Sequence, residues 1–357
     1  MRQSHPSRVL IAGGKPGGGI ASFAEALHSG FVDLGIPAEV VPDGAIFARP
    51  RELRDPQILK ILSIRAVFAA PFARRAFCVA HGFPCAANQG WPATIAILAS
   101  LNLAAACTGT QLVVVSEYSA LHLRSIFRLR IDAVIHNPLR PLFFEQPPQT
   151  SREAITFVGR LHRSKNVEKL IPAIRDVLDE NPGLRALIAG EGEMRPLLNH
   201  LASADPRIVI LGGLAAADVR DLLSRSRVFV SANPTEPFGI AYLEALSQGC
   251  VVAMPASGGG LEIAPELIGS TIQLFPSSVS RSGVASALRR ALQQEPRPSR
   301  MDCYSPRAVA EAYLAVDQRF APDGVFHAET TIGAAAIGTA SMERLHHASG
   351  LDNYPGL

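Results

Sequence analysis

The expected fold is decided by residues 228–254, which have the sequence Val-Phe-Val-Ser-Ala-Asn-Pro-Thr-Glu-Pro-Phe-Gly-Ile-Ala-Tyr-Leu-Glu-Ala-Leu-Ser-Gln-Gly-Cys-Val-Val-Ala-Met. The pattern predicts a buried strand at 228–231, a helix at 240–247 and another strand at 250–254. These elements form a βαβ unit, in which ligands bind beyond the carboxyl ends of the strands. We therefore expect the loop and the helix start between the strands to face a ligand.

Two carboxylates lie in this stretch, Glu236 in the loop and Glu244 in the helix. A carboxylate accepts two hydroxyl donors at once, so the pair suits the diols of a sugar or a ribose better than an unmetallated phosphate. The helix start at Gly239 and Ile240 adds free N–H groups. The spacing fits equally well a Glu236 that caps the helix and a Glu244 on a solvated face.

The second half of the chain alternates strands with helices. Strands are predicted near 155–158, 186–189, 207–211, 228–231, 250–254 and 271–275. Such alternation predicts a parallel sheet covered on both faces. Arg160 and Lys165 follow the first of these strands, and two cations in a loop above a strand suit a diphosphate, although they also fit ordinary surface charges.

A glycine loop occurs at residues 13–19, between a predicted strand at 8–12 and a predicted helix at 20–34. Its glycines would let the backbone approach a ligand closely. Pro16 follows Lys15 and no Ser or Thr is adjacent, so the loop is not a phosphate-binding P-loop, and it also lacks the GxGxxG spacing. A tight turn is the alternative. An NAD-dependent dehydrogenase with Asp43 as the ribose acid is a weaker reading, because it leaves the second half unexplained.

The string from Glu236 to Leu246, followed by Gly258-Gly259 and Glu262, resembles the signature of glycosyltransferase family 4. The resemblance covers residues 8–320 loosely and 155–262 closely. Cys250 replaces a more usual Pro, and Asn166 replaces a more usual Gly. The resemblance implies a retaining enzyme of the GT-B fold, an α/β architecture with two Rossmann-like doubly wound parallel-sheet domains facing a central cleft.

The resemblance also implies roles for individual residues. It places catalytic roles at His81, Arg160, Lys165 and Glu236. It places donor binding at Gly17, Gly18, Gly19, Gly159, Gly190, Phe238, Gly239, Ile240 and Glu244. Glu244 would bind the donor ribose, Glu236 would bind the donor sugar, and His81 would lie beside that sugar. A lone histidine is usually structural, but His81 stands at the end of a predicted strand, where active-site residues belong.

Composition limits the class of protein. A chain of 357 residues with 48% hydrophobic residues can form two domains with separate cores. The five cysteines lack a CxxC pair, so the sequence suggests neither a disulfide framework nor a zinc site and fits a reducing cytosol. No apolar run long enough for a signal peptide precedes the first strand. We therefore expect a cytoplasmic protein.

Positive charge concentrates in the first half. Residues 1–150 contain 14 Lys and Arg against 9 Asp and Glu, a net +5, which leaves 20 against 22, a net −2, for the rest. Seven cations lie in residues 49–75: Arg49, Arg51, Arg54, Lys60, Arg65, Arg74 and Arg75. A basic, apolar helical segment can lie weakly on an anionic membrane, or it can be a solvated face. We expect no nucleic-acid partner.

Residues 76–116 contain no Asp, Glu, Lys or Arg. They include a helical stretch at 92–107 that is too short to cross a membrane and carries Thr94, Ser100 and Asn102. We expect this stretch to be a buried core helix.

The predicted domain plan has five parts. Residues 1–145 form an acceptor-side domain, 146–153 a proline-rich linker, 154–305 a nucleotide-sugar donor domain, 306–320 a closing helix, and 321–357 a disordered tail without periodicity.

The expected function is transfer of a sugar from a nucleotide-diphosphate sugar to a glycan or lipid-linked acceptor, in cell-surface polysaccharide biosynthesis. We expect no cofactor and no metal, because the chain lacks the DxD motif of metal-dependent transferases. A peripheral position on the inner face of the membrane would accompany a lipid-linked acceptor. A non-catalytic nucleotide-sugar-binding protein is the main alternative.

Overall fold

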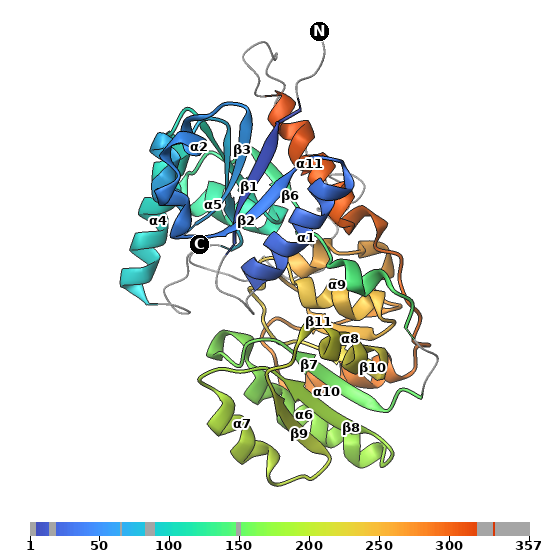
Figure 1. Cartoon of the computed structure of the whole chain (residues 1–357). Helices are drawn as coiled ribbons and strands as arrows, with labels where there is room; N and C mark the ends of the chain where they lie inside the picture. Colours follow the sequence, from blue (N-terminus) through green and yellow to red (C-terminus); the bar gives the residue numbers. More distant parts are fainter. Residues whose placement is uncertain are drawn as a thin grey trace. The chain divides into compact units, whose positions relative to one another are not determined.

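The computed structural model describes residues 5–13, 19–64, 66–82, 90–147, 151–319 and 331–332 (Figure 1). The chain divides into two units. Among the described residues, the first unit runs to Pro141 and resumes at Asp302, while the second is Leu142–Met301. Each unit has its own apolar core, centred on residues such as Leu10 and Leu112 in the first and Ile155 and Val228 in the second.

The first unit contains a sheet in the order β13-β6-β5-β4-β3-β1-β2, in which the paired strands are parallel. Its strands are β1 (Arg8–Gly13), β2 (Ala38–Pro42), β3 (Ile58–Ser63), β4 (Ala76–Ala80), β5 (Thr110–Val114), β6 (Ala133–Ile135) and β13 (Thr331–Ile332). β1, β3 and β4 lie in the interior of the sheet and are almost entirely buried, as expected for strands covered on both faces.

The helices of the first unit connect these strands. They are α1 (Gly19–Asp33), η1 (Ala45–Ala48), α2 (Pro50–Arg54), η2 (Val67–Phe72), α4 (Trp91–Ala106), α5 (Glu117–Phe127), η7 (Asp302–Tyr304) and α11 (Pro306–Arg319), and η3 (Pro141–Phe144) lies at the unit boundary. α11 packs against α1, where Gly30 lies so close to the Pro306 carbonyl that a Cβ would come within 2.0 Å of its oxygen. Arg75 donates two hydrogen bonds to Asp317 of α11, at 3.0 and 2.6 Å.

The structure corrects the prediction of a basic helical segment at residues 49–75. These residues form α2, β3 and η2, so the seven cations do not share one helix face. Lys60 is fully buried on β3, where its ammonium donates to the backbone carbonyls of Asp55 and Arg74. Arg49 pairs with Glu39. Arg65 lies outside the described residues. The exposed cations of the segment are therefore Arg51, Arg54 and Arg74.

The prediction of a buried core helix at 92–107 is also wrong in part. α4 buries Thr94, Ser100, Leu101 and Ala104, but Trp91 is 71% exposed and Ile95 is 61% exposed. The error arose because a charge-free sequence gives no sign of which helix face meets solvent.

The second unit contains a sheet in the order β12-β11-β10-β7-β8-β9, again with parallel pairs. Its strands are β7 (Ala154–Val158), β8 (Arg185–Ala189), β9 (Ile208–Gly212), β10 (Ser226–Val230), β11 (Val251–Pro255) and β12 (Ile272–Phe275). All six predicted strands exist within two residues of their expected bounds, and the predicted α/β class with two parallel sheets is confirmed.

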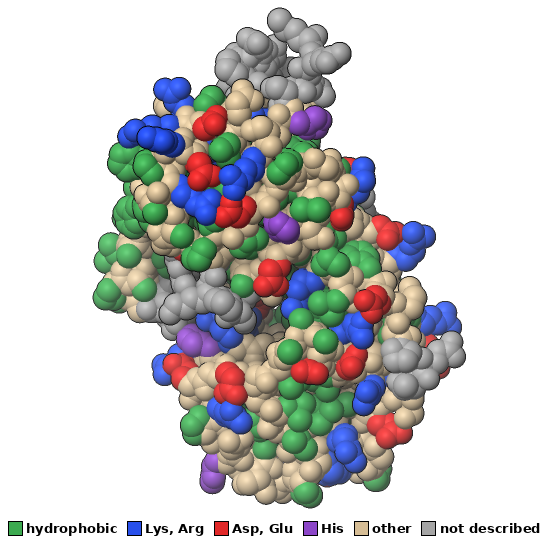
Figure 2. Space-filling view, in the orientation of Figure 1, with side chains coloured by type: hydrophobic (Ala, Val, Ile, Leu, Met, Phe, Trp, Pro, Cys, Tyr) green, Lys and Arg blue, Asp and Glu red, His purple; other side chains and the backbone are tan. Residues whose placement is uncertain are grey.

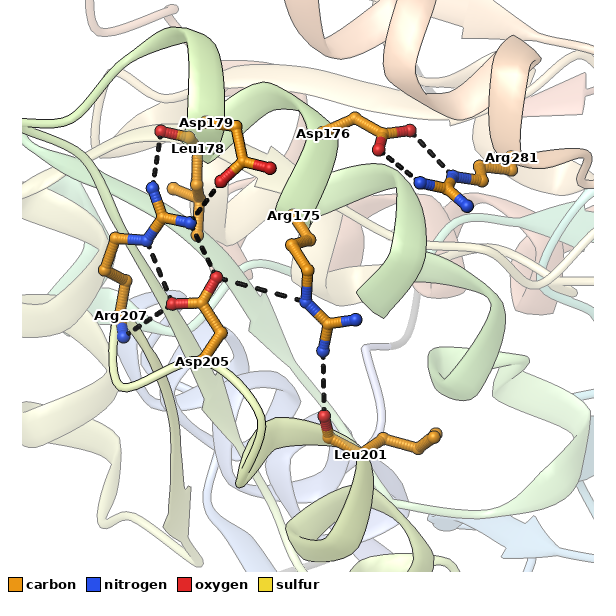
Figure 3. Close-up of polar contacts among 8 residues, drawn as sticks. All are labelled: Arg175, Asp176, Leu178, Asp179, Leu201, Asp205, Arg207 and Arg281. Atoms are coloured by element: carbon orange, nitrogen blue, oxygen red, sulfur yellow. Dashed lines mark hydrogen bonds and ion pairs between the residues drawn. The ribbon is translucent and has the colours of Figure 1, made fainter.

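The helices of the second unit are α6 (Val167–Glu180), α7 (Arg195–Ala202), α8 (Ala216–Ser224), α9 (Ile240–Ser247) and α10 (Arg281–Leu292), with the short helices η4 (Arg163–Lys165), η5 (Gly259–Glu262) and η6 (Pro265–Leu267). α6 buries one apolar face against the sheet and pairs its acidic residues with arginines (Figure 3). Arg207, just before β9, donates to Asp179 of α6 at 2.5 Å, and Arg281 of α10 donates to Asp176 of α6 at 2.8 Å. These pairs join α6 to β9 and α10.

The predicted disordered tail begins at residue 321. Within it, Thr331 and Ile332 pair with Val134 and Ile135 as a short parallel strand at the sheet edge, which corrects the prediction for these two residues. The rest of the tail lies outside the described residues.

Candidate active site

The strand order of the second sheet creates a switch point between β7 and β10. The chain moves outward from β7 through β8 to β9 and then forms β10 on the other side of β7. β7 and β10 pair directly, so the loops that follow them, residues 159–166 and 231–239, leave the same edge of the sheet as neighbours. In open parallel sheets, ligands bind in the crevice at such a switch point.

The two loops meet through an ion pair. The Lys165 ammonium, at the end of η4, donates a hydrogen bond to Oε2 of Glu236. Asn233 donates its side-chain N–H to the same oxygen at 3.0 Å. The side chains of Lys165 and Glu236 are 20% and 15% exposed, so the pair is partly shielded but accessible. Lys165, Glu236 and Asn233 are called the switch-point cluster below.

Electrostatics keep Glu236 ionised. Burial raises the pKa of this carboxyl, but the charge and hydrogen bond of Lys165 and the amide of Asn233 outweigh burial and lower the pKa below its usual value. Arg160 adds a weaker contribution through its charge. An ionised Glu236 can accept hydroxyl hydrogen bonds, and Lys165 can turn toward an incoming anion.

Backbone contacts hold the β10 loop in place. Asn166 donates its amide to the Ala232 carbonyl at 3.1 Å. Gly259 donates its N–H to the Glu236 carbonyl at 2.8 Å, which ties the loop to η5. Asn166, the departure from the family pattern, has a φ of 48°, a left-handed conformation that Asn tolerates better than most residues. The replacement of Gly by Asn therefore preserves the turn.

Two candidate donor-binding glycines occupy positions without room for a side chain. A Cβ on Gly190 would lie 1.8 Å from the Gly159 carbonyl oxygen, and Gly190 has a φ of 147°. A Cβ on Gly239 would lie 2.2 Å from the Tyr242 ring, and Gly239 has a φ of 94°. The loops after β7 and β8 therefore touch through their backbones, and α9 begins immediately after a left-handed turn.

α9 places Glu244 inside the protein. Its side chain is 6% exposed, so the alternative of a solvated helix face is wrong. Phe238 is also buried, and Ile240 opens the helix. The free N–H groups of the first turn of α9 follow directly on the loop that carries Glu236, which combines anion and hydroxyl recognition at one edge.

Arg160 differs from Lys165. It is exposed, and no described residue accepts a hydrogen bond from its guanidinium. The β7 loop therefore holds two paired cations, Lys165 and Arg163, and one exposed cation, Arg160, that is available to a ligand.

The remaining predicted residues belong to the first unit. His81 follows β4, and its ring meets the edge of Phe23 at a centroid distance of 4.5 Å. Burial lowers the pKa of His81 to about 4, against the effect of the Asn137 side chain, so the imidazole is neutral at pH 7. Gly19 is the first residue of α1, while Gly17 and Gly18 lie outside the described residues. That His81 lies beside the donor sugar stays a prediction, as does the central cleft.

Sequence reasoning missed Asn233. The sequence does place this polar residue three positions before Glu236 and shortly after a predicted buried strand. Asn233 carries no charge, however, and it lies outside the family motif. Within the described ranges, no cluster of three or more His, Cys, Asp or Glu side chains could hold a metal ion. Nor is any helix in the described part of the chain long and apolar enough to span a bilayer.

These features define an α/β protein whose second unit has a polar, cation-bearing edge at a topological switch point. Residues 140–307, a little under half of the chain, match the family model described as "Glycosyl transferases group 1". This match confirms the prediction of a glycosyltransferase-type domain in the second half. The retaining stereochemistry and assignment to family 4 stay predictions.

Similarity to a protein named as a glycosyltransferase also supports a glycosyltransferase-type domain in this chain. The Homo sapiens phosphatidylinositol N-acetylglucosaminyltransferase subunit is 32% identical over 149 residues, which cover 40% of this chain and 31% of that protein. The chain spans about a third of the length of the first curated relatives it matches.

Two solved structures show the fold. Anabaena HepE in complex with UDP and glucose has a TM-score of 0.64 at 14% identity and covers 97% of this chain and 100% of its own. WaaG, a glycosyltransferase involved in lipopolysaccharide biosynthesis, has a TM-score of 0.61 at 14% identity, with coverage of 88% and 94%. The chain has the GT-B fold.

Proposed function

We propose that the chain is a glycosyltransferase that moves a sugar from a nucleotide-diphosphate sugar to an acceptor hydroxyl. The observation that carries the proposal is the switch-point cluster, which joins an ionised carboxylate to a lysine ammonium within the residues that match the family model. The HepE structure binds UDP and glucose, which supports a nucleotide-sugar donor here.

The donor would lie along the carboxyl-end edge of the second sheet. Glu244 would accept hydrogen bonds from the ribose hydroxyls, because it is a buried carboxylate one helical turn beyond the β10 loop. Gly159 and Gly190 would let the diphosphate approach the backbone, and Arg160 would supply a two-pronged cation. Glu236 would accept hydroxyls of the sugar.

Transfer breaks the bond between the sugar C1 and the diphosphate oxygen and forms a bond from C1 to the acceptor oxygen. Negative charge grows on the leaving diphosphate while C1 becomes oxocarbenium-like. Lys165 and Arg160 would stabilise the departing charge, which is the largest contribution such a site can make. A neutral His81 can accept or donate one hydrogen bond without adding a positive charge.

The stereochemical outcome, the metal requirement and the acceptor are further parts of the proposal. We propose retention at C1, no metal requirement and a glycan or lipid-linked acceptor in cell-surface polysaccharide assembly. The role of WaaG in lipopolysaccharide biosynthesis supports that class of acceptor. A metal-free enzyme keeps its full turnover in EDTA, whereas activity that EDTA abolishes and manganese or magnesium restores contradicts this part.

The test is a thermal-shift panel of UDP-, GDP- and ADP-sugars and NAD, followed by donor-consumption assays with the sugar that stabilises the protein most. A ligand that binds only the folded state stabilises it by RT ln(1 + [L]/Kd), so the donor class that binds should raise the melting temperature. Stabilisation with donor consumption supports the proposal. Stabilisation without turnover in an acceptor screen indicates a binding protein, and stabilisation by NAD alone indicates a dehydrogenase.

A further inference from the structure

The first unit exposes four large apolar side chains on two adjacent elements. Phe68 and Phe72 of η2 are 60% and 57% exposed, and Trp91 and Ile95 of α4 are 71% and 61% exposed. These are the four highest values among the exposed large hydrophobic residues of the described chain. η2 and α4 pack against each other, so the four side chains belong to one region of the surface. We call this region the η2–α4 surface.

The outer face of α4 is apolar except for Asn102. Its exposed residues are Trp91, Pro92, Ile95, Ala96, Ala99, Asn102 and Ala106. They recur every three or four positions, which defines one face of a helix. The helix contains no charged residue, whereas the solvent face of an ordinary surface helix is charged or polar. An apolar outer stripe of this kind marks an interaction surface.

Cations border the η2–α4 surface. Arg51 and Arg54 project from α2, which packs against η2, and Arg74 follows η2 directly. Figure 2 shows hydrophobic side chains gathered over the region of α4, with Lys and Arg side chains near them over α2. All three arginines are exposed, and no described residue pairs with them.

The two carboxylates of the same region are already engaged. Glu52 pairs with Arg8 at 3.2 Å, and Asp55 accepts a hydrogen bond from the Gln57 N–H at 2.8 Å. An N–H hydrogen bond does not neutralise the charge of Asp55, but the three exposed arginines outnumber this one carboxylate, so the border of the η2–α4 surface carries a net positive charge.

We propose that the η2–α4 surface docks on an anionic lipid bilayer, with Phe68, Phe72, Trp91 and Ile95 entering the interfacial layer and Arg51, Arg54 and Arg74 facing lipid phosphates. Aromatic side chains prefer the interface between headgroups and acyl chains, and cations bind anionic headgroups. Charges of one sign around a charge-free apolar centre complement such a membrane. A protein partner would need a matching acidic border, and a second copy would bring like charges together.

This surface differs from the one that sequence reasoning chose. Lys60 and Arg75 cannot take part, because Lys60 is fully buried and Arg75 holds Asp317. In the proposed membrane contact, the apolar side chains contribute more than the cations do. The inference does not depend on the transfer reaction, so either can fail without the other.

Trp91 is the single tryptophan of the chain, which makes intrinsic fluorescence a specific reporter. The experiment titrates the full chain with phosphatidylglycerol vesicles and with neutral phosphatidylcholine vesicles and follows the emission maximum. Transfer of Trp91 into the interface shifts the maximum to the blue with anionic vesicles, and salt weakens the binding because the electrostatic attraction is screened.

Variants separate the η2–α4 surface from general stickiness. Phe68→Ser with Phe72→Ser weakens vesicle partitioning by about tenfold or more, because buried apolar area sets interfacial binding. Leu121→Ser with Ile126→Ser on α5 is the matched control, since these residues are 47% and 48% exposed in the same unit. Arg51→Glu with Arg54→Glu also weakens binding, whereas Arg128→Glu leaves it unchanged.

Three results overturn the proposal. One is an emission maximum that anionic vesicles do not shift. Another is equal loss of binding in the α5 control. The third is a blue shift that appears without vesicles and follows protein concentration, together with a dimer in light scattering, which assigns the surface to a second copy of the chain.

Discussion

The two units share a parallel, helix-covered architecture but place their charged and apolar residues differently. In the second unit, charges meet at the carboxyl-end edge of the sheet, where Lys165 pairs with Glu236 and where Arg195 donates to Glu191. In the first unit, no described residue forms a comparable charged pair at His81, which follows β4, and the exposed cations lie beside exposed aromatic rings. The second unit thus gathers charged side chains at the end of its sheet, and the first exposes an apolar surface.

The largest expected effect concerns the backbone of the second unit. Gly190→Ala should destabilise it by about 3 kcal/mol or more, because a Cβ would overlap the Gly159 carbonyl and the φ of 147° disfavours a side chain. Gly183→Ala is the control, since its Cβ would meet nothing within 4 Å. Thermal unfolding measures both, and equal melting temperatures would refute the close approach of the loops.

The next effect tests the switch-point cluster. Lys165→Ala should lower turnover by about 100-fold, because the leaving group loses a preorganised cation, and it should weaken donor binding less. Arg163→Ala is the matched control in the same short helix, where Arg163 pairs with Glu193. Steady-state kinetics that show similar losses for both variants would mean that overall charge, and not the position of Lys165, supports catalysis.

A smaller effect is expected at Glu244. Glu244→Ala should weaken nucleotide-sugar binding by about 1–3 kcal/mol, because buried ribose hydroxyls lose a charged acceptor. Calorimetric titration of the donor measures the change, with Glu266→Ala as an exposed control from the same unit. Unchanged affinity would exclude Glu244 from the donor site.

The smallest effect concerns acid stability. Hydrogen bonds from Arg207 lower the pKa of Asp205 below its usual 3.8. The unfolded state therefore binds its proton first as the pH falls, and the stabilisation, fully present above pH 4, is lost as the pH drops through the lowered pKa. Asp205→Asn should lower the melting temperature at pH 7, and the difference from wild type should narrow below pH 4. If the difference in melting temperature between Asp205→Asn and wild type is the same at pH 7 and below pH 4, the substitution acts through packing and not through the charge of Asp205.

The sequence predicts most strands of the second unit because hydrophobic runs, glycines and the residues of the motif determine the local structure of the chain. The sequence motif and the spacing of charges point to Glu236, Glu244 and Lys165 without any knowledge of their contacts. Asn233 escaped because its role depends on a tertiary hydrogen bond to Glu236 that no periodicity announces. Lys60 was mistaken for a surface cation for the same reason. It is fully buried, and its ammonium donates hydrogen bonds to backbone carbonyl oxygens.

The first unit was harder to predict because its errors concern which face meets solvent. The charge-free helix at 91–106 satisfied every criterion for burial except a packing partner on its outer side, and partners are a property of the fold. The basic segment failed for a related reason, since charge alone does not reveal whether a cation is paired, as Arg75 is by Asp317.

Hydrogen–deuterium exchange of the full chain, with and without the nucleotide sugar selected by thermal shift, tests the central claim most directly. A donor site at the switch point predicts that the bound nucleotide sugar slows exchange in residues 159–166 and 231–240 of the second unit and leaves exchange in residues 67–72 and 91–106 of the first unit unchanged. Protection confined to the first unit, or unchanged exchange around Lys165 and Glu236 at saturating donor, would contradict a donor site at the switch point of the second sheet.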